Sequence, residues 1–328
     1  MAGEKCSPYN YDLICLGGLS VDLILRAPHL PTLDEKLVVQ YAGKQAGGLV
    51  ANAACAAGRL GLKVAWTGAV GDDDFGHLSM NSFAQFGVDT SLANINPCIA
   101  TDFTVILLDP GGDRTILVVP TSPSPPQVGP RAIEALRHTQ LVYTLPQPPA
   151  WFTSIADAVH AGGGLVAVDI EGTSTVRGEE LWAVLERTDI VFCNRRGLLL
   201  TVGEANKASS HNDTEAMQNN ARRLLQMGVK IVCVTLGKEG ALGVNAEQVI
   251  QAPGYSAPVI DTTGAGDCFH AAFLYAHLNR YPLPEALQFA NAAAALSVGY
   301  LGARGGLPTE QQVTTFLAEA GKRNQTWG

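Results

Sequence analysis

The sequence predicts an α/β fold in which helices cover both faces of a mostly parallel β-sheet. Strands that are buried on both faces are apolar throughout, and they alternate with amphipathic helices along the chain. Short apolar runs of this kind lie at residues 13–16, 64–70, 141–144, 165–169, 190–193 and 231–236. Segments with helical spacing of apolar residues separate them, at 51–60, 75–86, 151–161, 179–186 and 214–227. The last third predicts three successive helices, at 268–278, 284–299 and 309–320.

Length and composition favour one large globular domain that spans residues 1–328. Hydrophobic residues make up 47% of the chain and charged residues 16%, which is typical of a protein with a sizeable core. The formal net charge of −8 argues against a nucleic-acid partner, and no apolar stretch is long enough to predict a membrane span. The seven cysteines form no close pair, so we expect free thiols and a cytoplasmic location. Small molecules are the expected partners.

Two β-rich runs do not fit the alternation and predict a small antiparallel sheet. Residues 102–109 and 114–119 flank Pro110-Gly111-Gly112-Asp113, a strong hairpin signal, and residues 36–41 form a further β-like run. One interpretation is a lid over the functional site, and the alternative is an ordinary hairpin at the edge of the main sheet. The lid segments would span about residues 32–45 and 98–120.

The stretch Asp261-Thr262-Thr263-Gly264-Ala265-Gly266-Asp267 stands directly before an apolar helix and is the strongest candidate for chemistry. Its two glycines allow an anion to approach backbone N–H groups at the helix N-terminus, where the helix dipole also favours negative charge. Asp267 lies in the first turn of this helix. An anion cradle beside a carboxylate suits phosphoryl transfer, in which the carboxylate takes a proton from the attacking hydroxyl.

Several further positions are candidates for binding hydroxyl groups. Gly48 and Asn52 open a helix of small residues, where a glycine admits a ligand to the backbone and an amide both donates and accepts. Asp22 follows the first strand, at the end of the sheet where ligands of α/β proteins bind. Asp34 lies in a proline-containing turn and is a weaker candidate. The alternatives are a packing role for Asn52 and turn chemistry for both aspartates.

Two strand ends are candidates for a nucleotide site. Residues 235–240 end a buried strand in a glycine-containing turn, which suits a ribose or a phosphate. Asn194 follows another strand and precedes Arg195 and Arg196, for which a solvated surface position is the alternative. The chain has no P-loop motif, and the spacing of its histidines and cysteines gives no zinc motif.

Two well-separated motifs resemble those of the PfkB or ribokinase-like carbohydrate kinases. The first is Gly47-Gly48-x-x-Ala51-Asn52, followed by Gly61 and by Val70-Gly71-Asp72-Asp73-x-x-Gly76. The second is Asp261-Thr262-Thr263-Gly264-Ala265-Gly266-Asp267-x-Phe269. The resemblance covers nearly the whole chain, and it includes Thr235-Leu236-Gly237-x-x-Gly240-Ala241 and the tail from Gly302-Ala303 to Leu307-Pro308-Thr309.

The resemblance implies a three-layer αβα fold with a small β lid, and the ATP-dependent phosphorylation of a primary hydroxyl on a small sugar. Asp267 would be the general base, and Gly264, Ala265 and Gly266 would form the anion hole. ATP and Mg²⁺ are the implied cofactors, and a requirement for K⁺ stays open. No residue is identified as a metal ligand. A homodimer that forms through the lid is expected. With the resemblance, the candidate substrate-binding residues are Asp22, Asp34, Gly48, Asn52, Arg114 and Asp169, and the candidate nucleotide-binding residues are Asn194, Thr235, Gly237, Gly240 and Asn291.

Two departures from the family pattern bear on the metal and the acceptor. Many members carry N-x-x-E, whose glutamate helps to organise magnesium, whereas Asn194 is followed by Gly197 here. Leu49 stands where ribokinases and ketohexokinases have a polar residue that touches the sugar. Neither ribose nor fructose therefore follows as the substrate.

The acceptor has several interpretations. The surroundings of Arg114 and Asp169 look like those of ketohexokinase-like and sulfosugar-kinase-like members, and Arg114 is a candidate ligand for an anionic substituent. The alternative for Arg114 is a hairpin arginine that faces solvent or a lid partner. A nucleoside kinase of the same fold, with Leu49 and Phe103 as apolar walls, is a second hypothesis. A non-catalytic family member that binds a sugar or nucleotide is a third.

Overall fold

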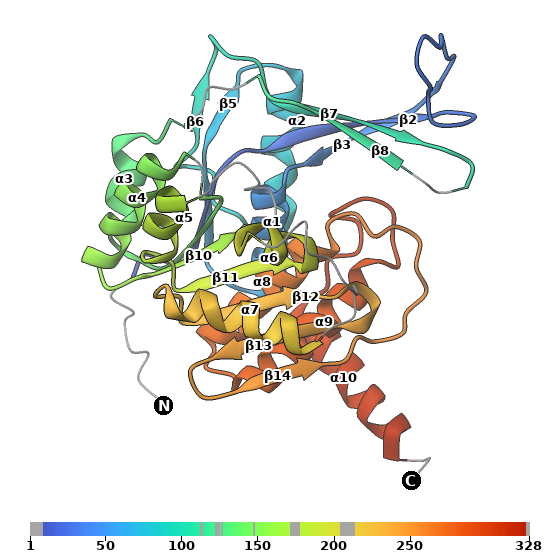
Figure 1. The fold of residues 1–328 in the computed structure, drawn as a ribbon. Coiled ribbons are helices and arrows are strands. Elements are labelled where there is room, and N and C mark those ends of the chain that lie inside the picture. Colours follow the sequence, from blue (N-terminus) through green and yellow to red (C-terminus); the bar gives the residue numbers. More distant parts are fainter. Residues whose placement is uncertain are drawn as a thin grey trace.

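The computed structural model shows a central eight-stranded sheet with helices on both of its faces (Figure 1). It describes residues 9–111, 114–121, 125, 127–146, 148–170, 178–203 and 214–325. The strand order is β14-β13-β12-β11-β10-β9-β1-β4. Six strands are parallel, namely β1 (Tyr11–Leu16), β4 (Val64–Thr67), β9 (Thr139–Thr144), β10 (Leu165–Asp169), β11 (Ile190–Asn194) and β12 (Ile231–Thr235). At one end of the sheet, β13 (Ala241–Asn245) and the edge strand β14 (Val249–Ala252) are antiparallel to their neighbours.

The predicted mostly parallel sheet is confirmed, because every apolar run contributes one of its strands. The run at 64–70 divides in two, however. After β4 the chain leaves the main sheet and forms β5 (Ala69–Gly71), which pairs with β6 (Asn94–Asn96). The apolar pattern does not indicate this division, since VAWT and AVG read as parts of one continuous run.

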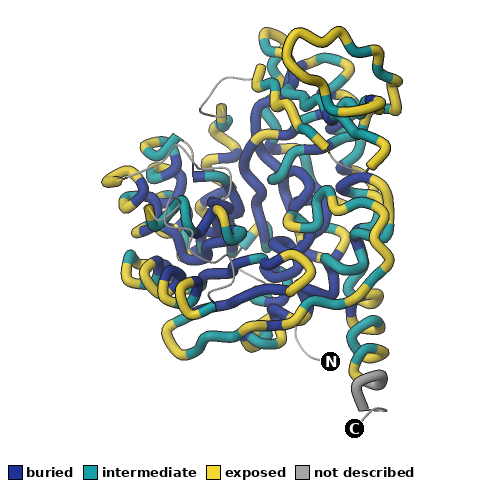
Figure 2. Tube along the Cα trace, turned by 45° about the vertical axis from the view of Figure 1, so that its right-hand side comes forward, coloured by how far each residue is buried: buried dark blue, intermediate teal, exposed yellow. Residues whose placement is uncertain are grey.

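The helices form two layers, and each layer has its own hydrophobic core against one face of the sheet. Successive residues of β1 alternate between them: Leu13 and Cys15 pack into one core, and Ile14 and Leu16 into the other. The first layer contains α1 (Leu49–Leu60), α8 (Ala265–Leu278), α9 (Leu283–Ser297) and α10 (Glu310–Gln325). The second contains α3 (Pro130–Leu136), α4 (Pro149–Ala161), α5 (Gly178–Leu185), α6 (Arg195–Thr201) and α7 (Thr214–Gln226). Figure 2 shows buried chain in the interior of the molecule and exposed chain mainly at its periphery.

A second sheet, here called the small sheet, projects from the main body (Figure 1). Its order is β3-β2-β7-β8, with β2 (Ser20–Arg26), β3 (Gln40–Gly47), β7 (Phe103–Leu108) and β8 (Arg114–Val119). The helix α2 (Asp74–Phe83) and the 3-10 turn η1 (Ala84–Phe86) follow β5, and α2 contacts β2 and β3 of the small sheet. The hairpin β7–β8 is confirmed, although Gly112 and Asp113 of its turn lie outside the described residues.

The small sheet differs from the predicted antiparallel sheet in two ways. Its two central strands, β2 and β7, are parallel, because the chain runs outward along each of them and returns along β3 and β8. The strand β2 was not predicted at all, and its neighbour β3 begins at Gln40, so most of the predicted run at 36–41 lies outside any strand. Asp22 consequently belongs to a strand of the small sheet and not to a turn after β1.

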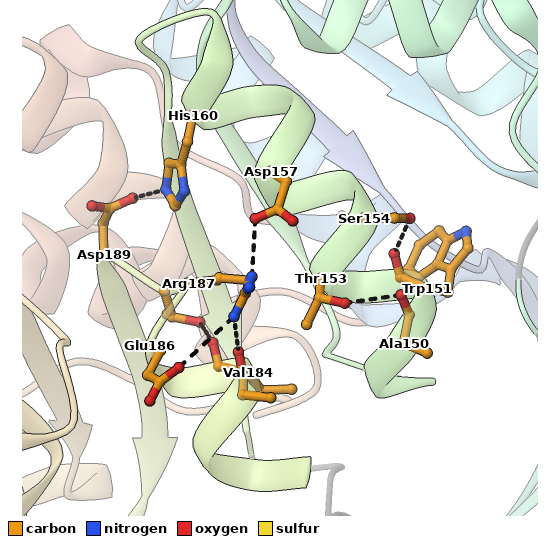
Figure 3. Close-up of polar contacts among 12 residues, drawn as sticks. Ala150, Trp151, Thr153, Ser154, Asp157, His160, Val184, Glu186, Arg187 and Asp189 are labelled. Carbon is orange, nitrogen blue, oxygen red and sulfur yellow. Dashed lines mark hydrogen bonds and ion pairs between the residues drawn. The ribbon is translucent and has the colours of Figure 1, made fainter. Parts of the chain in front are cut away.

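On the second helix layer, a group of polar side chains ties α4 to residues 187–189, which connect α5 to β11 (Figure 3). The buried Asp189 carboxylate accepts from the Nε2 of His160 at 2.9 Å and from the Val166 N–H at 2.8 Å, and lies 2.7 Å from the Nζ of Lys230. Burial favours its protonated form, but these donors hold the pKa of Asp189 below its usual range. This group lies on the helix layer opposite to α8. Within the described ranges, no helix is both long and apolar enough to cross a membrane.

Candidate active site

The N-terminus of α8 is held in place by the turn that begins at Asp261. One carboxylate oxygen of Asp261 accepts from the Thr263 N–H at 2.9 Å and from its hydroxyl at 2.7 Å, and the other accepts from the Gly302 N–H at 2.9 Å. Gly264 precedes α8 with a φ of 76°, and a Cβ there would lie 2.7 Å from the Cβ of Ala303. Both the backbone angle and the close packing therefore require glycine at this position.

The first turn of α8 presents its backbone to open space. A Cβ built on Gly266 would meet no heavy atom within 4 Å. The Ala265 N–H closes a turn on the Thr262 carbonyl at 3.3 Å, and the Cys268 N–H makes the first helical bond, to the Gly264 carbonyl at 2.9 Å. N–H groups of a first helical turn point out of the helix N-terminus, so this end of α8 is suited to a negatively charged group.

Asp267 is linked to α1 and to a loop near the C-terminus by a chain of hydrogen bonds. Its Oδ2 accepts from the Nδ2 of Asn52 at 2.8 Å, and the Oδ1 of Asn52 accepts from the Nε of Arg304 at 2.9 Å. Asn52 is buried, with 5% of its surface exposed. The structure thus brings together Asp267 and Asn52, two residues that are 215 positions apart in the sequence.

A hollow of about 690 Å³ lies between the small sheet and the Asp261 turn, and we call it the small-sheet hollow. Asp22 lines it from β2, and the hydroxyl of Thr104 on β7 donates to this carboxylate. Burial raises the pKa of Asp22, while the Thr104 hydrogen bond and the charge of Arg304 act against this rise. The other lining residues include Ile24, Arg26, Ile106, Leu108, Asp109, Arg114, Val259, Ile260, Asp261, Thr262, Thr263 and Leu301.

Arg114 crosses this hollow from the small sheet to the main body. Its Nη1 lies 3.1 Å from the hydroxyl of Thr263 and 3.6 Å from Asp261, and its Nη2 lies 3.5 Å from the hydroxyl of Thr262. Burial favours protonation of Asp261, but the hydrogen bonds from Thr263 and Gly302 and the charge of Arg114 lower the pKa of this carboxyl. Arg114 therefore already has an anionic partner within the protein.

A second hollow, of about 470 Å³, lies on the other side of the α8 N-terminus, and we call it the glycine cavity. Four residues predicted for a nucleotide site line it: Thr235, Gly237, Gly240 and Asn291. The glycines belong to the 3-10 turn η2 (Gly237–Glu239) and its end, and Asn291 donates to the carbonyls of Ala252 and Pro253 at 3.1 Å each. Ala265 and Gly266 line the same cavity, and so do the apolar side chains of Tyr255, Val259, Phe269, Ala294 and Val298.

Three predicted site residues lie elsewhere. Asp34 is exposed in the connection between β2 and β3, and Asn194 uses its Oδ1 to cap α6 by accepting from the Gly197 N–H at 2.7 Å. Asp169 is fully buried at the end of β10, 3.8 Å from the Nδ1 of His270. Burial lowers the pKa of His270 to about 3, so this imidazole is neutral at physiological pH. None of the three is among the residues that line either hollow, and Gly48, Asn52, Gly264 and Asp267 are also outside both linings.

The two side chains suggested as apolar walls also take other positions. Phe103 packs against Phe75 of α2, with ring centroids 5.9 Å apart, and Leu49 packs against the core of the first helix layer. Gly48 caps the N-terminus of α1 with a φ of 94°. The apolar wall of the small-sheet hollow comes instead from β2, β7 and residues 259–260.

Arg304 was not predicted from the sequence, although it holds the centre of the site. It lies in the loop between α9 and α10 and donates to Asn52, to the Gly47 carbonyl at 2.9 Å and to the hydroxyl of Ser82. A signal for it was present, since Arg304 is the single charged residue between Glu285 and Glu310. A single charged residue in a glycine-rich, otherwise apolar stretch indicates a cation that is paired within the protein, because unpaired charges are rarely buried.

Comparisons with known proteins agree with this geometry. A model of the pfkB family of carbohydrate kinases matches residues 10–310. The chain is 28% identical over 310 residues to a ribokinase of Haemophilus influenzae, covering 94% of this chain and 99% of that protein. It is 29% identical over 310 residues to an ATP-dependent ribose-1-phosphate kinase of Halopiger xanaduensis, covering 94% and 98%. The solved structure of Arabidopsis thaliana ribokinase with ribose and ATP superposes with a TM-score of 0.84 at 27% identity, covering 94% of this chain and 98% of the other.

Proposed function

Because the chain belongs to the pfkB family of carbohydrate kinases, we propose that it transfers the γ-phosphoryl group of ATP to a primary hydroxyl of a small, uncharged sugar. The observation that carries this proposal is the position of the first turn of α8 between two hollows. Thr262 and Val259 line both of them, so the two hollows adjoin at the segment that leads into α8. In this proposal the acceptor and the phosphate donor face each other there, beside the Asp267 carboxylate and the backbone amides of the first turn.

In this proposal, Asp267 takes the proton from the acceptor hydroxyl while the backbone of Gly264 to Gly266 stabilises the charge on the phosphoryl group. The helix N-terminus supplies N–H groups that are oriented before the reaction, so little reorganisation is required as charge builds up. Asn52 keeps the Asp267 carboxylate in one position by donating to its Oδ2. Positioning and electrostatic stabilisation of this kind supply most of the catalysis in phosphoryl transfer.

The glycine cavity is the proposed ATP site. Its glycines admit the ribose and phosphates to the backbone, and Phe269, Ala294 and Val298 give the adenine ring an apolar surface. Among the described residues, no group of three His, Cys, Asp or Glu side chains is placed to hold a metal ion. This fits Mg²⁺, which usually binds through nucleotide phosphates and water with few protein ligands, and which would neutralise charge on the phosphates.

The small-sheet hollow is the proposed acceptor site, with Asp22 as the main ligand for sugar hydroxyls. The hollow is lined by three carboxylates, Asp22, Asp109 and Asp261, and by two guanidinium groups, Arg26 and Arg114. Since Arg114 is already paired with the Asp261 carboxylate, the charges that line the hollow disfavour an anionic group on the acceptor. We therefore favour an uncharged sugar over a carboxylated, sulfonated or phosphorylated one.

A nucleoside is the second candidate acceptor. The hollow is larger than one pentose requires, and Ile24, Ile106, Leu108, Val259 and Ile260 form an apolar wall that a nucleobase would cover. A ribokinase-like chain with this wall would bind the ribose at Asp22 and the base toward the open end. This reading keeps the same base, the same anion hole and the same ATP site.

The proposal is tested by a coupled ADP-release screen over ketoses, pentoses, acid sugars and nucleosides, with and without K⁺. Turnover with an uncharged sugar supports the proposal, and turnover with nucleosides alone would replace it by the second candidate. A response to K⁺ in the same plates decides the open question of a monovalent cation. Absence of ADP production with every acceptor, together with a thermal shift on ligand addition, would identify a non-catalytic binding protein.

We also propose that the chain forms a homodimer through the small sheet. Its edge strand β8 exposes Ile116, Leu117 and Val118 by 47%, 50% and 69%, and Tyr41 of β3 is 61% exposed. Apolar side chains on an open strand edge favour pairing with another copy of the strand. Multi-angle light scattering of the wild type and of Val118→Asp measures the oligomeric state directly.

A further inference from the structure

Arg304 is a partly buried cation whose hydrogen-bond acceptors are all neutral. They are the side-chain oxygen of Asn52, the backbone carbonyl of Gly47 and the hydroxyl of Ser82. Its guanidinium also stacks on Phe83, 5.3 Å from the ring centroid. A buried charge is costly unless it is well bonded, so this three-way contact indicates that the guanidinium plane is held in one orientation.

The donor properties of arginine determine how the Asn52 amide is turned. An asparagine side chain can present either its oxygen or its NH₂ group to a neighbour, and the surrounding network decides between them. Arginine has only donors, so the group that faces Arg304 Nε must be the Asn52 oxygen. The NH₂ group is then directed to Asp267, which it meets at 2.8 Å.

The charge of Arg304 also acts on its surroundings. Asp22 and Asp267 both lie close enough to stabilise the guanidinium, and the positive charge in turn acts against the rise that burial causes in the pKa of Asp22. The cation is nevertheless separated from Asp267 by the Asn52 side chain. A neutral amide thus makes the direct contact with the proposed base, while the cation sets the direction of that amide.

We propose that Arg304 is a positioning residue for the proposed base, and that it acts by fixing the Asn52 amide in the orientation that donates to Asp267. The inference rests on the proposed function of Asp267. It adds to the residues that determine the rate one that lines neither the small-sheet hollow nor the glycine cavity. Without Arg304, the Asn52 oxygen loses its donor, so the amide is held at one end only and can rotate out of the orientation that anchors Asp267 beside the acceptor hydroxyl.

The test is a double-mutant cycle between Arg304→Met and Asn52→Ala. Methionine keeps much of the length of arginine but has no donor, so we expect kcat to fall about 10- to 100-fold while KM for ATP changes less than about twofold. If Arg304 acts through Asn52, the double variant will be no slower than the slower single variant. Arg304→Lys keeps the charge and one donor and should recover part of the rate.

Arg59 provides the matched control. It is an exposed arginine of α1 and lines the same surface hollow of about 500 Å³ as Arg304. Arg59→Gln should leave kcat unchanged. Additive losses in the cycle, a wild-type kcat for Arg304→Met, or an Asn52→Ala variant with undiminished kcat would each overturn the inference. Melting temperatures of all variants separate loss of positioning from loss of folding, and Arg304→Lys keeps the comparison available if the methionine variant unfolds.

A measurement that needs no turnover separates this inference from the proposed function. The side-chain amide resonances of Asn52 report its two hydrogen bonds in a ¹⁵N–¹H spectrum. We expect them to shift strongly in Arg304→Met and to stay in place in Arg59→Gln. If the wild type phosphorylates no acceptor, the proposed function fails while these spectra still decide the orientation of the amide. Unchanged Asn52 resonances in Arg304→Met would refute the inference even in an active kinase.

Discussion

Two aspartates in this molecule, Asp189 and Asp267, are bonded in different ways. Asp189 meets a cationic Lys230 Nζ directly at 2.7 Å and also accepts from His160. Asp267 accepts from a neutral amide at 2.8 Å, and the cation of that network, Arg304, lies beyond the amide. A cation therefore contacts Asp189 directly, whereas Arg304 contacts the amide that donates to Asp267.

The difference teaches how a carboxylate is kept available for proton transfer. A carboxylate in direct contact with a cation loses basicity, which suits a permanent structural link between a helix layer and the sheet. A general base has to bind a proton during each turnover, so a directly paired cation would oppose its function. In the proposed arrangement, the cation one residue away would keep the Asp267 carboxylate oriented and still allow it to be protonated.

The largest expected effect tests the reacting member of this pair. Asp267→Asn removes the proposed base while keeping its size, so kcat should fall by about three orders of magnitude or more with ATP binding nearly intact. Steady-state kinetics and ATP titration measure the two quantities. Asp189→Asn is the matched control and should leave kcat within about twofold. Retained turnover in Asp267→Asn would remove Asp267 from its role.

The next effect concerns stability at the structural member. Asp189→Asn takes a direct anion away from Lys230 and His160, which should lower the free energy of unfolding by about 1–3 kcal/mol at neutral pH, since Lys230 is largely exposed and screened. Because the pKa of Asp189 is lowered in the folded state, its contribution is complete above about pH 4 and is lost as the pH falls through the folded pKa.

Urea unfolding at a series of pH values checks this. The free energy of unfolding of the variant should approach that of the wild type below the folded pKa of Asp189, where the wild-type carboxyl is protonated and therefore uncharged like the asparagine. A constant difference between the two proteins at every pH would show that the contribution of Asp189 does not depend on its charge.

The smallest effect concerns Asp261, whose contact with a cation is intermediate between the direct contact of Asp189 and the indirect one of Asp267. Its cation, Arg114, comes from the small sheet and is 3.6 Å away and partly exposed. Exposed ion pairs contribute up to about 1 kcal/mol, so Arg114→Met should raise KM for the acceptor up to about fivefold and leave kcat and the melting temperature almost unchanged. High salt should reproduce part of this increase in the wild type only. A kcat defect as large as that of Asp267→Asn would place Arg114 among the reacting groups.

The sequence predicted the parallel sheet well because each of its strands is a continuous apolar run, as in Ile190–Asn194. It missed β2, since Ser20–Arg26 combines apolar residues with Asp22 and Arg26 and resembles a turn that carries polar ligands. The antiparallel strands β13 and β14 were also missed, because a glycine and polar residues interrupt their apolar pattern.

Prediction of the site depended on local motifs. The glycine turns near Thr235 and Gly264 were identifiable because glycines at a strand or helix end leave a clear pattern in the sequence. Arg304 is marked only as a lone charge in an apolar stretch, and this does not identify its partner Asn52, which lies 252 positions away. Only the tertiary packing of α1 and α8 brings these residues together, and that packing cannot be derived from spacing along the chain.

The short connections of the small sheet have a mechanical consequence. Only residues 17–19 separate β1 from β2, and Gly48 alone separates β3 from α1. Gly48 cannot be replaced without disturbing this connection, because a Cβ there would lie 2.8 Å from the Cα of Leu19. Since Asp22 lies on β2 and Asn52 on α1, these short connections fix the spacing between the proposed acceptor ligand and the contact of Asn52 with Asp267.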